Sequence, residues 1–292
     1  MQPRVFQVGI LQLKPSKGKR AQNLEHLKTA MQELLAAGEQ PDVLVLPEGA
    51  LTGYFLQGGV RELAVSREML FEELEDIWRE VWNAPLDMVI GFFERSDNDY
   101  YNSGLYAQFG GEHPGIKHVH RKVFLPTYGV FDEERYQSRG SDFEAFNTRF
   151  GTCAMVICED AWHTITTTIC ALKGAEVIYI PSASPVRNLE GEEPSNVRYW
   201  HNLVSGIAAE HGVFAVLSSL PGFEGGKGLM GASALFHPRG HIVARAPILE
   251  EAVVLASINL DEIQPARYEN PLLSDLRAGL PGMIASLEEA IR

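Results

Sequence analysis

Short apolar runs alternate with amphipathic segments along most of the chain. Residues 43–46 and 88–93 read as buried strands, whereas Leu24, Leu27 and Met31 recur at helical spacing. Alternation of this kind is typical of layered α/β proteins. The pattern predicts strands over 5–11, 43–46, 88–93, 105–109, 116–119, 152–157, 176–180, 213–218, 232–236, 241–245 and 252–258, and helices over 24–35, 67–82, 162–173 and 196–210.

The last part of the chain has a different pattern. After Asp261 the dipeptides Gln-Pro at 264–265 and Asn-Pro at 270–271 predict irregular chain, followed by a short amphipathic tail over 281–292. No repeat, low-complexity tract or linker divides the sequence. We therefore expect a single domain over 1–292, with 271–292 as a C-terminal tail.

Composition narrows the class of protein. The chain has 292 residues, of which 45% are hydrophobic and 22% charged, as in globular proteins. A net charge of -13 argues against nucleic acid or an anionic membrane as a partner. Three cysteines fit a reducing compartment, and no run reaches the ~18 apolar residues of a spanning helix. Residues 1–20 lack a signal-like apolar segment, so we expect a cytoplasmic protein.

One thiol lies between a predicted strand and a predicted helix. The apolar run 152–157 ends at Cys158, and an acidic pair and a helix-like segment follow at once. A helix amino terminus offers partial positive charge and backbone N–H groups, which lower the pKa of a thiol and bind an oxyanion. We predict Cys158 as a nucleophile, the alternative being a core cysteine at a strand end. Cys153 and Cys170 are expected to be structural.

Two further segments have the same strand-end placement. Glu48 follows the run 43–46, and Lys122 follows a predicted hairpin, ahead of Glu133 in Phe-Asp-Glu. In this order with Cys158, the motifs resemble the nitrilase superfamily of carbon–nitrogen hydrolases from about residue 5 to residue 267. The resemblance implies Glu48 as general base, Lys122 as oxyanion stabiliser and Cys158 as nucleophile. It also implies Glu133 as a supporting glutamate, and a four-layer α-β-β-α sandwich as the fold.

The chemistry is consistent with these roles. A neutral thiol needs a base or a nearby cation, and no histidine has a suggestive placement for a Cys–His pair. A carboxylate whose pKa is raised by burial and by a like-charged neighbour accepts the thiol proton. Lys122 and the backbone N–H of Glu159 would stabilise the oxyanion. We expect amide hydrolysis through a thioester at Cys158, with no metal or organic cofactor. Taken alone, each charged residue also fits a solvated surface position.

Three segments, 125–133, 158–162 and 180–185, look most similar to the glutaminase part of glutamine-dependent NAD synthetases. Those enzymes continue into a synthetase domain with a Ser-Gly-Gly phosphate loop, and nothing like it occurs in this sequence. The resemblance therefore favours a free-standing amidase, or a glutaminase-like subunit that passes ammonia to a partner, over a complete NAD synthetase. A non-catalytic binding protein is less favoured, because all four candidate catalytic positions are intact.

Residues near the motifs are expected to contact a small-molecule amide substrate. Arg187 or Arg198 would pair with a substrate carboxylate, or each is simply a surface charge. Trp162 is as well explained by packing as by a role in the acyl pocket. Nitriles and N-carbamoyl compounds need the same triad, but amide cleavage is the commoner activity in similar families. The expected pocket walls are Tyr54, Phe124, Tyr128, Trp162, Ser184 and Trp200.

Apolar residues of the tail predict contact with another chain. Leu272, Leu273, Leu276 and Leu280 would be poorly covered in a lone sandwich. In related proteins such tails cross to a neighbouring subunit. We therefore expect a homodimer or a larger homo-oligomer, with the helix after Cys158 in the interface.

Overall fold

The computed structural model describes residues 4–187 and 193–292. Within these residues the strands form two six-stranded sheets and one two-stranded hairpin. The first sheet contains, in spatial order, β14 (Ala252–Asn259), β1 (Val5–Gln12), β2 (Val43–Val45), β3 (Leu86–Ser96), β4 (Asp99–Phe109) and β5 (Gly115–Arg121). The second contains β13 (Ile242–Arg245), β12 (Ala234–Phe236), β9 (Phe214–Ser219), β8 (Val177–Ser182), β7 (Thr152–Met155) and β6 (Ala145–Asn147).

The central strands of both sheets are parallel. In the first sheet β2 pairs in parallel with β1 and β3, and in the second β8 pairs in parallel with β7 and β9. The outer strands are antiparallel. Parallel strands end at the same edge of a sheet, so segments far apart in sequence meet there.

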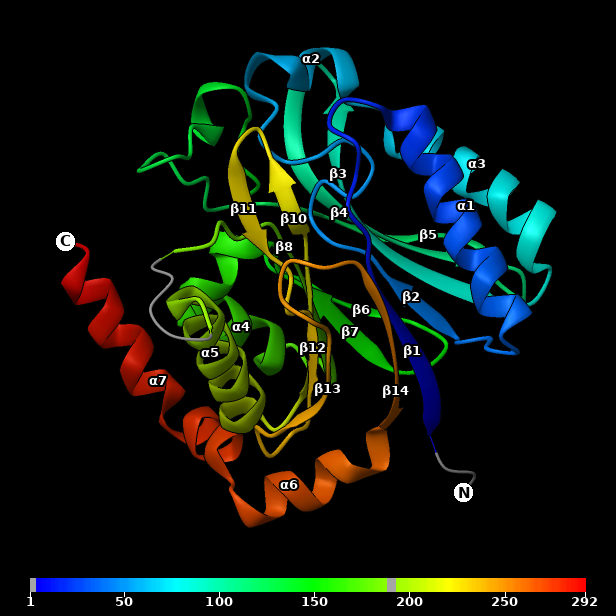
Figure 1. The fold of residues 1–292 in the computed structure, drawn as a ribbon. Coiled ribbons are helices and arrows are strands. Elements are labelled where there is room, and N and C mark those ends of the chain that lie inside the picture. The colour runs from blue at the N-terminus through cyan, green and yellow to red at the C-terminus, as the bar shows by residue number, and fades with distance from the viewer. Residues whose placement is uncertain (1–3, 188–192) are drawn as a thin grey trace.

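The two sheets pack face to face through a shared apolar core. Val8 and Val45 of the first sheet belong to one buried cluster with Met155 and Tyr179 of the second. Helices α1 (Arg20–Ala36) and α3 (Arg67–Ile77) cover the outer face of the first sheet, and α4 (Thr164–Leu172) and α5 (Ser195–His211) cover that of the second (Figure 1). The expected four-layer α-β-β-α sandwich is confirmed.

The chain after Asp261 is helical, so the expectation of an irregular segment is wrong. It forms α6 (Ile263–Glu269) and α7 (Leu272–Ala290). Pro265 lies in the first turn of α6, where a helix needs no N–H donor, and Pro271 directly precedes α7. These prolines therefore mark helix starts. Among the helices of the described residues, none has the length and apolar character to span a bilayer.

Smaller elements also differ from the sequence expectations. The helix expected over 162–173 is α-helical only in α4 and is preceded by a 3₁₀ turn at Cys158–Trp162. A short helix, α2 (Val60–Leu63), follows the loop after β2. The hairpin formed by β10 (Pro221–Glu224) and β11 (Lys227–Met230) was not predicted, because its glycines and exposed aromatic residue obscure the strand pattern.

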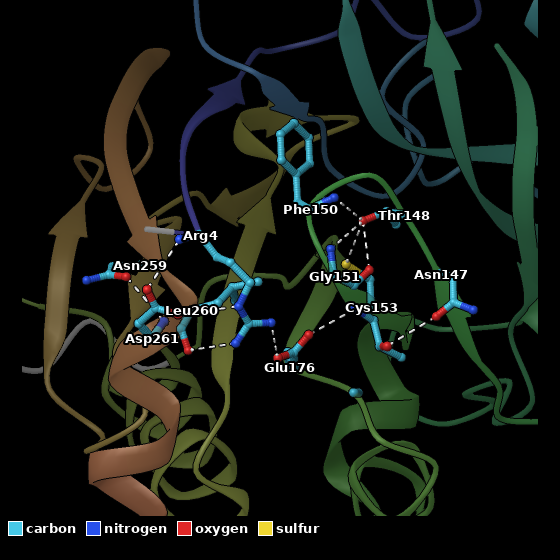
Figure 2. A network of polar contacts seen from close by, with 12 residues as sticks. Arg4, Asn147, Thr148, Phe150, Gly151, Cys153, Glu176, Asn259, Leu260 and Asp261 are labelled. Carbon is cyan, nitrogen blue, oxygen red and sulfur yellow. Dashed lines mark hydrogen bonds and ion pairs between the residues drawn. The ribbon is translucent and has the colours of Figure 1, made fainter. Parts of the chain in front are cut away.

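Arg4 joins the two sheets at the end of the sandwich where β7 and β8 begin (Figure 2). Its Nη1 lies 2.7 Å from Glu176 Oε1, and its Nε lies 3.4 Å from Asp261 Oδ1. Glu176 Oε2 accepts a hydrogen bond of 3.1 Å from the backbone N–H of Thr152. Arg4 is about half exposed, so each ion pair contributes at most about 1 kcal/mol. The network fixes the end of the sandwich opposite to the carboxyl ends of the parallel strands.

Candidate active site

Three chemically active side chains follow strands that end at the same edge of the sandwich. Glu48 follows β2, Lys122 directly follows β5, and Cys158 lies just beyond β7. The first two strands belong to one sheet and the third to the other. All three side chains are buried, and Glu48 and Lys122 are wholly so.

The Lys122 ammonium lies between two carboxylates. Its Nζ is 2.8 Å from Glu48 Oε1 and 2.7 Å from Glu133 Oε1. Burial alone would lower the pKa of Lys122, but the charges of Glu133 and Glu48 hold it well above its ordinary value. Lys122 therefore stays charged. The sequence-predicted residues Glu48, Lys122 and Glu133 are brought together.

Neutral donors complete the binding of the same two carboxylate oxygens. Asn102 Nδ2 donates to Glu48 Oε1 over 2.6 Å, and the Tyr54 hydroxyl donates to Glu133 Oε1. Within the described residues, the second oxygen of each carboxylate has no hydrogen-bond partner. Burial raises the pKa of Glu133 to about 7, opposed by Lys122 and assisted by Glu48. One buried oxygen of Glu48 and one of Glu133 thus remain available to accept a proton or a hydrogen bond.

The backbone at Cys158 is strained. Its φ is +47°, a left-handed conformation that is costly for a residue other than glycine and that often marks a functional site. The Ser182 hydroxyl lies 3.5 Å from Cys158 Sγ. Burial raises the pKa of the Cys158 thiol, Glu48 adds to the shift, and Lys122 opposes it. The expectation of a lowered pKa is therefore wrong, and burial favours the neutral thiol.

Asp160 connects the two sheets behind these residues. Its Oδ1 accepts hydrogen bonds of 3.0 and 2.9 Å from the two backbone N–H groups that follow Lys122. Its Oδ2 accepts one of 3.1 Å from the N–H of the residue before Cys158, and lies 2.8 Å from His120 Nε2. Sequence reasoning missed this role. The only signal was the position of Asp160 two residues after the predicted nucleophile.

A cavity of about 280 Å³ opens at Cys158. Of the predicted pocket residues, Tyr54 and Phe124 do not line this cavity: Tyr54 donates to Glu133, and Phe124 stacks on His163. Arg187 lines the cavity, whereas the exposed Arg198 does not. The cavity is lined by Tyr128, Phe131, Cys158, Glu159, Trp162, Ser184, Arg187, Ser195, Asn196, Tyr199 and Trp200. Phe131, Ser195, Asn196 and Tyr199 were not predicted, since nothing in the sequence marks them.

Tyr128, a predicted wall residue, forms a hydrogen bond with Glu159, the predicted oxyanion donor. The Tyr128 hydroxyl donates to Glu159 Oε2 over 2.8 Å. Burial and this hydrogen bond raise the pKa of Tyr128 to about 12. The Glu159 side chain is thereby turned to the cavity wall.

A larger cavity of about 430 Å³, between Arg67 and His118, contains none of the three candidate catalytic side chains. Across residues 4–187 and 193–292, no group of three or more His, Cys, Asp or Glu side chains is placed to bind a metal ion.

Comparison with known proteins identifies the family. A family model described as carbon–nitrogen hydrolase matches residues 7–268. The chain belongs to this family. N-carbamoylputrescine amidase of Solanum lycopersicum is 29% identical over an alignment of 213 residues, and the match covers 68% of each chain. Glutamine-dependent NAD(+) synthetase of Rhodobacter capsulatus is 29% identical over 250 residues, which are 85% of this chain and 43% of that protein.

The fold agrees with this assignment. The crystal structure of a carbon–nitrogen hydrolase from Helicobacter pylori superposes with a TM-score of 0.82 and 23% identity. The superposition covers 97% of this chain and 99% of the other. The protein is therefore a carbon–nitrogen hydrolase of the nitrilase superfamily, and the resemblance stated from the sequence is confirmed.

Gly91 of β3 tests how tightly the position of Glu48 is fixed. A Cβ at Gly91 would lie 2.5 Å from Glu48 Cα and 2.7 Å from Pro47 O. Because both are backbone atoms, we expect Gly91→Ala to lower the free energy of unfolding by about 1–3 kcal/mol and to reduce turnover. Gly206→Ala in α5 is the control: nothing lies within 4 Å of that position, so the variant should gain about 0.5–1 kcal/mol. Urea denaturation that gives both variants the wild-type stability would contradict this prediction.

Proposed function

We propose that the protein hydrolyses the amide bond of a small molecule through a covalent Cys158 thioester. One observation carries the proposal: the Lys122 ammonium is held by Glu48 and Glu133, while the second oxygen of Glu48 has no partner within the described residues. A buried acceptor beside a buried cation suits a reaction that moves a proton and then stabilises an oxyanion.

In the first half of the reaction, Glu48 takes the proton of the Cys158 thiol. The thiolate attacks the amide carbon, forming a carbon–sulfur bond and a tetrahedral oxyanion. Lys122 Nζ and the backbone N–H of Glu159 donate to that oxygen. The intermediate then expels ammonia or an amine, which leaves with the proton from Glu48. Because the resting thiol is neutral, this proton transfer is a required step.

In the second half, water replaces the amine. Glu48 removes a proton from the water, and the resulting hydroxide attacks the thioester carbon. Lys122 again donates a hydrogen bond to the oxyanion that forms. Collapse breaks the carbon–sulfur bond and returns the proton to Cys158. Glu133 supports both halves by holding Lys122 in place, 2.7 Å from its carboxylate.

The substrate proposed is a small amide. A cavity of about 280 Å³ lies just below the usual range for ligand sites, and its aromatic walls suit a short, partly apolar substrate. Arg187 on the wall supports including amides that carry a carboxylate. The N-carbamoylputrescine amidase relative supports including N-carbamoyl compounds, and nitriles complete the panel. Ammonia release by purified protein across this panel tests the substrate class.

A second candidate is a glutaminase-like subunit that supplies ammonia to a partner. The match to an NAD synthetase over 85% of this chain favours it. Glutaminase activity that increases when a synthetase is added would support this alternative over the free-standing amidase.

We also propose that residues 1–292 act as one hydrolase domain in the cytoplasm. Cys153, Cys158 and Cys170 are all free thiols, as expected in a reducing compartment.

We propose in addition that two copies associate through the face made by α4, α5 and α7. Ile165 on α4 and Tyr199 on α5 expose 49% and 63% of their surface. On α7, Ile284 and Leu287 expose 47% and 52%, whereas Leu273 is buried against the rest of the chain. Figure 1 shows α7 running beside α5, and α7 contacts both α4 and α5. Apolar exposure of this extent favours a two-fold interface.

The nucleophile is tested by substitution and labelling. Cys158→Ala should abolish turnover with little change in folding, because it removes the atom that forms the thioester. Iodoacetamide should label Cys158 fastest, since it alone of the three cysteines lines the cavity within the described residues. Cys153→Ala and Cys170→Ala are the controls and should stay active. Turnover by Cys158→Ala, or faster labelling elsewhere, would overturn the assignment.

The base and the cation are tested separately. Glu48→Gln removes the proton acceptor and Lys122→Ala the oxyanion donor, so each should lower kcat roughly 100-fold or more. Matched controls are Glu144→Gln and Lys173→Ala, which disrupt a surface ion pair. Steady-state kinetics of the four variants decide the question. Equal kcat values for the site and surface variants would contradict the proposed roles.

Assembly is tested by light scattering at micromolar concentration. The wild-type protein should have at least twice the mass of one chain. Ile284→Glu places a charge on the proposed interface and should shift the mass toward that of one chain. Tyr268→Glu on α6, at a side chain that is 87% exposed, is the control and should not. A wild-type protein that is monomeric and fully active would refute the proposed dimer.

A further inference from the structure

The hairpin β10–β11 carries a buried carboxylate that the proposed reaction does not use. Glu224, the last residue of β10, is only 6% exposed. Its nearest cation within the described residues is Lys17, whose side chain is 45% exposed and whose Nζ lies 4.0 Å away. Burying a carboxylate is costly unless hydrogen bonds compensate, so the donors that surround Glu224 reveal what it does.

Both oxygens of Glu224 accept hydrogen bonds from the loop after β2. Oε2 accepts from the backbone N–H of Tyr54 over 2.9 Å, and Oε1 from that of Phe55 over 2.6 Å. Hydrogen bonds from N–H groups to an ionised acceptor are stronger than those between neutral groups. The carboxylate therefore holds this loop at two successive residues.

The residue before Tyr54 confirms how closely the carboxylate approaches. Gly53 has a φ of +80°, and a Cβ built there would lie 2.5 Å from Glu224 Oε2. The carboxylate occupies the space that any other side chain would need. The loop and the hairpin thus fit each other through a contact that only glycine permits.

The side chain of Tyr54 extends this contact into the active site. Its hydroxyl donates to Glu133 Oε1, the same oxygen that lies 2.7 Å from Lys122 Nζ. We propose that Glu224 is a positioning residue, which acts through Tyr54 to hold Glu133 and Lys122 in their reactive arrangement. This inference rests on the proposed function of the site.

The hairpin also reaches the cavity wall. The backbone N–H of Met230 donates to Ser184 O over 2.9 Å, and that of Val186 donates to Gly228 O over 2.7 Å. Tyr54 and Leu229 also share one buried apolar cluster. The hairpin that carries Glu224 is thus held by the segment 184–186 and by Tyr54. These contacts fix the position of its carboxylate.

Glu224→Gln tests the inference, since it keeps the shape but replaces one acceptor oxygen with an amide donor that faces a backbone N–H. The groups that face Glu133 are Lys122 after β5, Glu48 after β2 and Tyr54 on the loop, and the Tyr54 hydrogen bond lowers the pKa of Glu133. Loosening that bond should raise this pKa. Because Glu133 must be ionised to hold Lys122, the acidic limb of the pH–rate profile should move to higher pH, by about one unit.

We expect kcat at neutral pH to fall roughly 10- to 100-fold, with a much smaller change in KM. Tyr54→Phe should shift the acidic limb in the same direction, and the double variant should shift it no further, since both act on one chain of contacts. Glu176→Gln is the matched control: this glutamate also accepts a backbone N–H, at the opposite end of the sandwich, and should leave the profile unchanged.

Effects of Glu224→Gln and Tyr54→Phe that multiply, or an equal loss in Glu176→Gln, would overturn the inference. If Glu224→Gln does not fold, Glu224→Asp keeps the charge but shortens the reach, and should give a smaller shift in the same direction. The pH dependence of Cys158 alkylation by iodoacetamide is measured for every variant. If wild-type protein releases ammonia from no compound of the panel, the proposed function fails, while the alkylation profiles still decide the role of Glu224.

Discussion

The structure depends on one buried ammonium between two carboxylates. Lys122, Glu48 and Glu133 place one ammonium and two carboxyl groups in direct contact at a buried position. Such a cluster persists only when additional donors compensate, as the Tyr54 hydroxyl and the Asn102 amide do here. Removing the ammonium would leave two carboxylates facing each other, and one would take up a proton. The positions of these three side chains and the pKa values of the two carboxyl groups therefore depend on one another.

The sandwich holds the residues of this cluster in place. Parallel strands in both sheets deliver Glu48, Lys122 and Cys158 to one edge, and each arrives on backbone fixed by the sheet. Asp160 then joins the two sheets by accepting from backbone next to both Lys122 and Cys158. The relative position of Lys122 and Cys158 thus depends on a shared acceptor rather than on either sheet alone. Preorganisation of this kind reduces the reorganisation required during reaction.

The sequence predicted the layers and the central residues because both follow from local patterns. Apolar runs of strand length end at Glu48 and Cys158, and a hairpin pattern leads to Lys122. The left-handed backbone at Cys158 has no signal in the local pattern, and the partners of Glu224 were not predictable because they lie more than a hundred residues away in sequence. The helices after Asp261 were missed because proline reads as a breaker, whereas Pro265 and Pro271 stand at helix starts.

The neutral resting state of the Cys158 thiol bears on how the protein withstands oxidants. Peroxides react with thiolates far more readily than with thiols, so a sulfur whose pKa is raised by burial is a poor target between catalytic events. In the proposed mechanism the thiolate forms as the proton passes to Glu48. The reactivity of this sulfur is thereby tied to the transfer of its proton. Slow formation of sulfenic acid at Cys158 is the expected consequence of this burial.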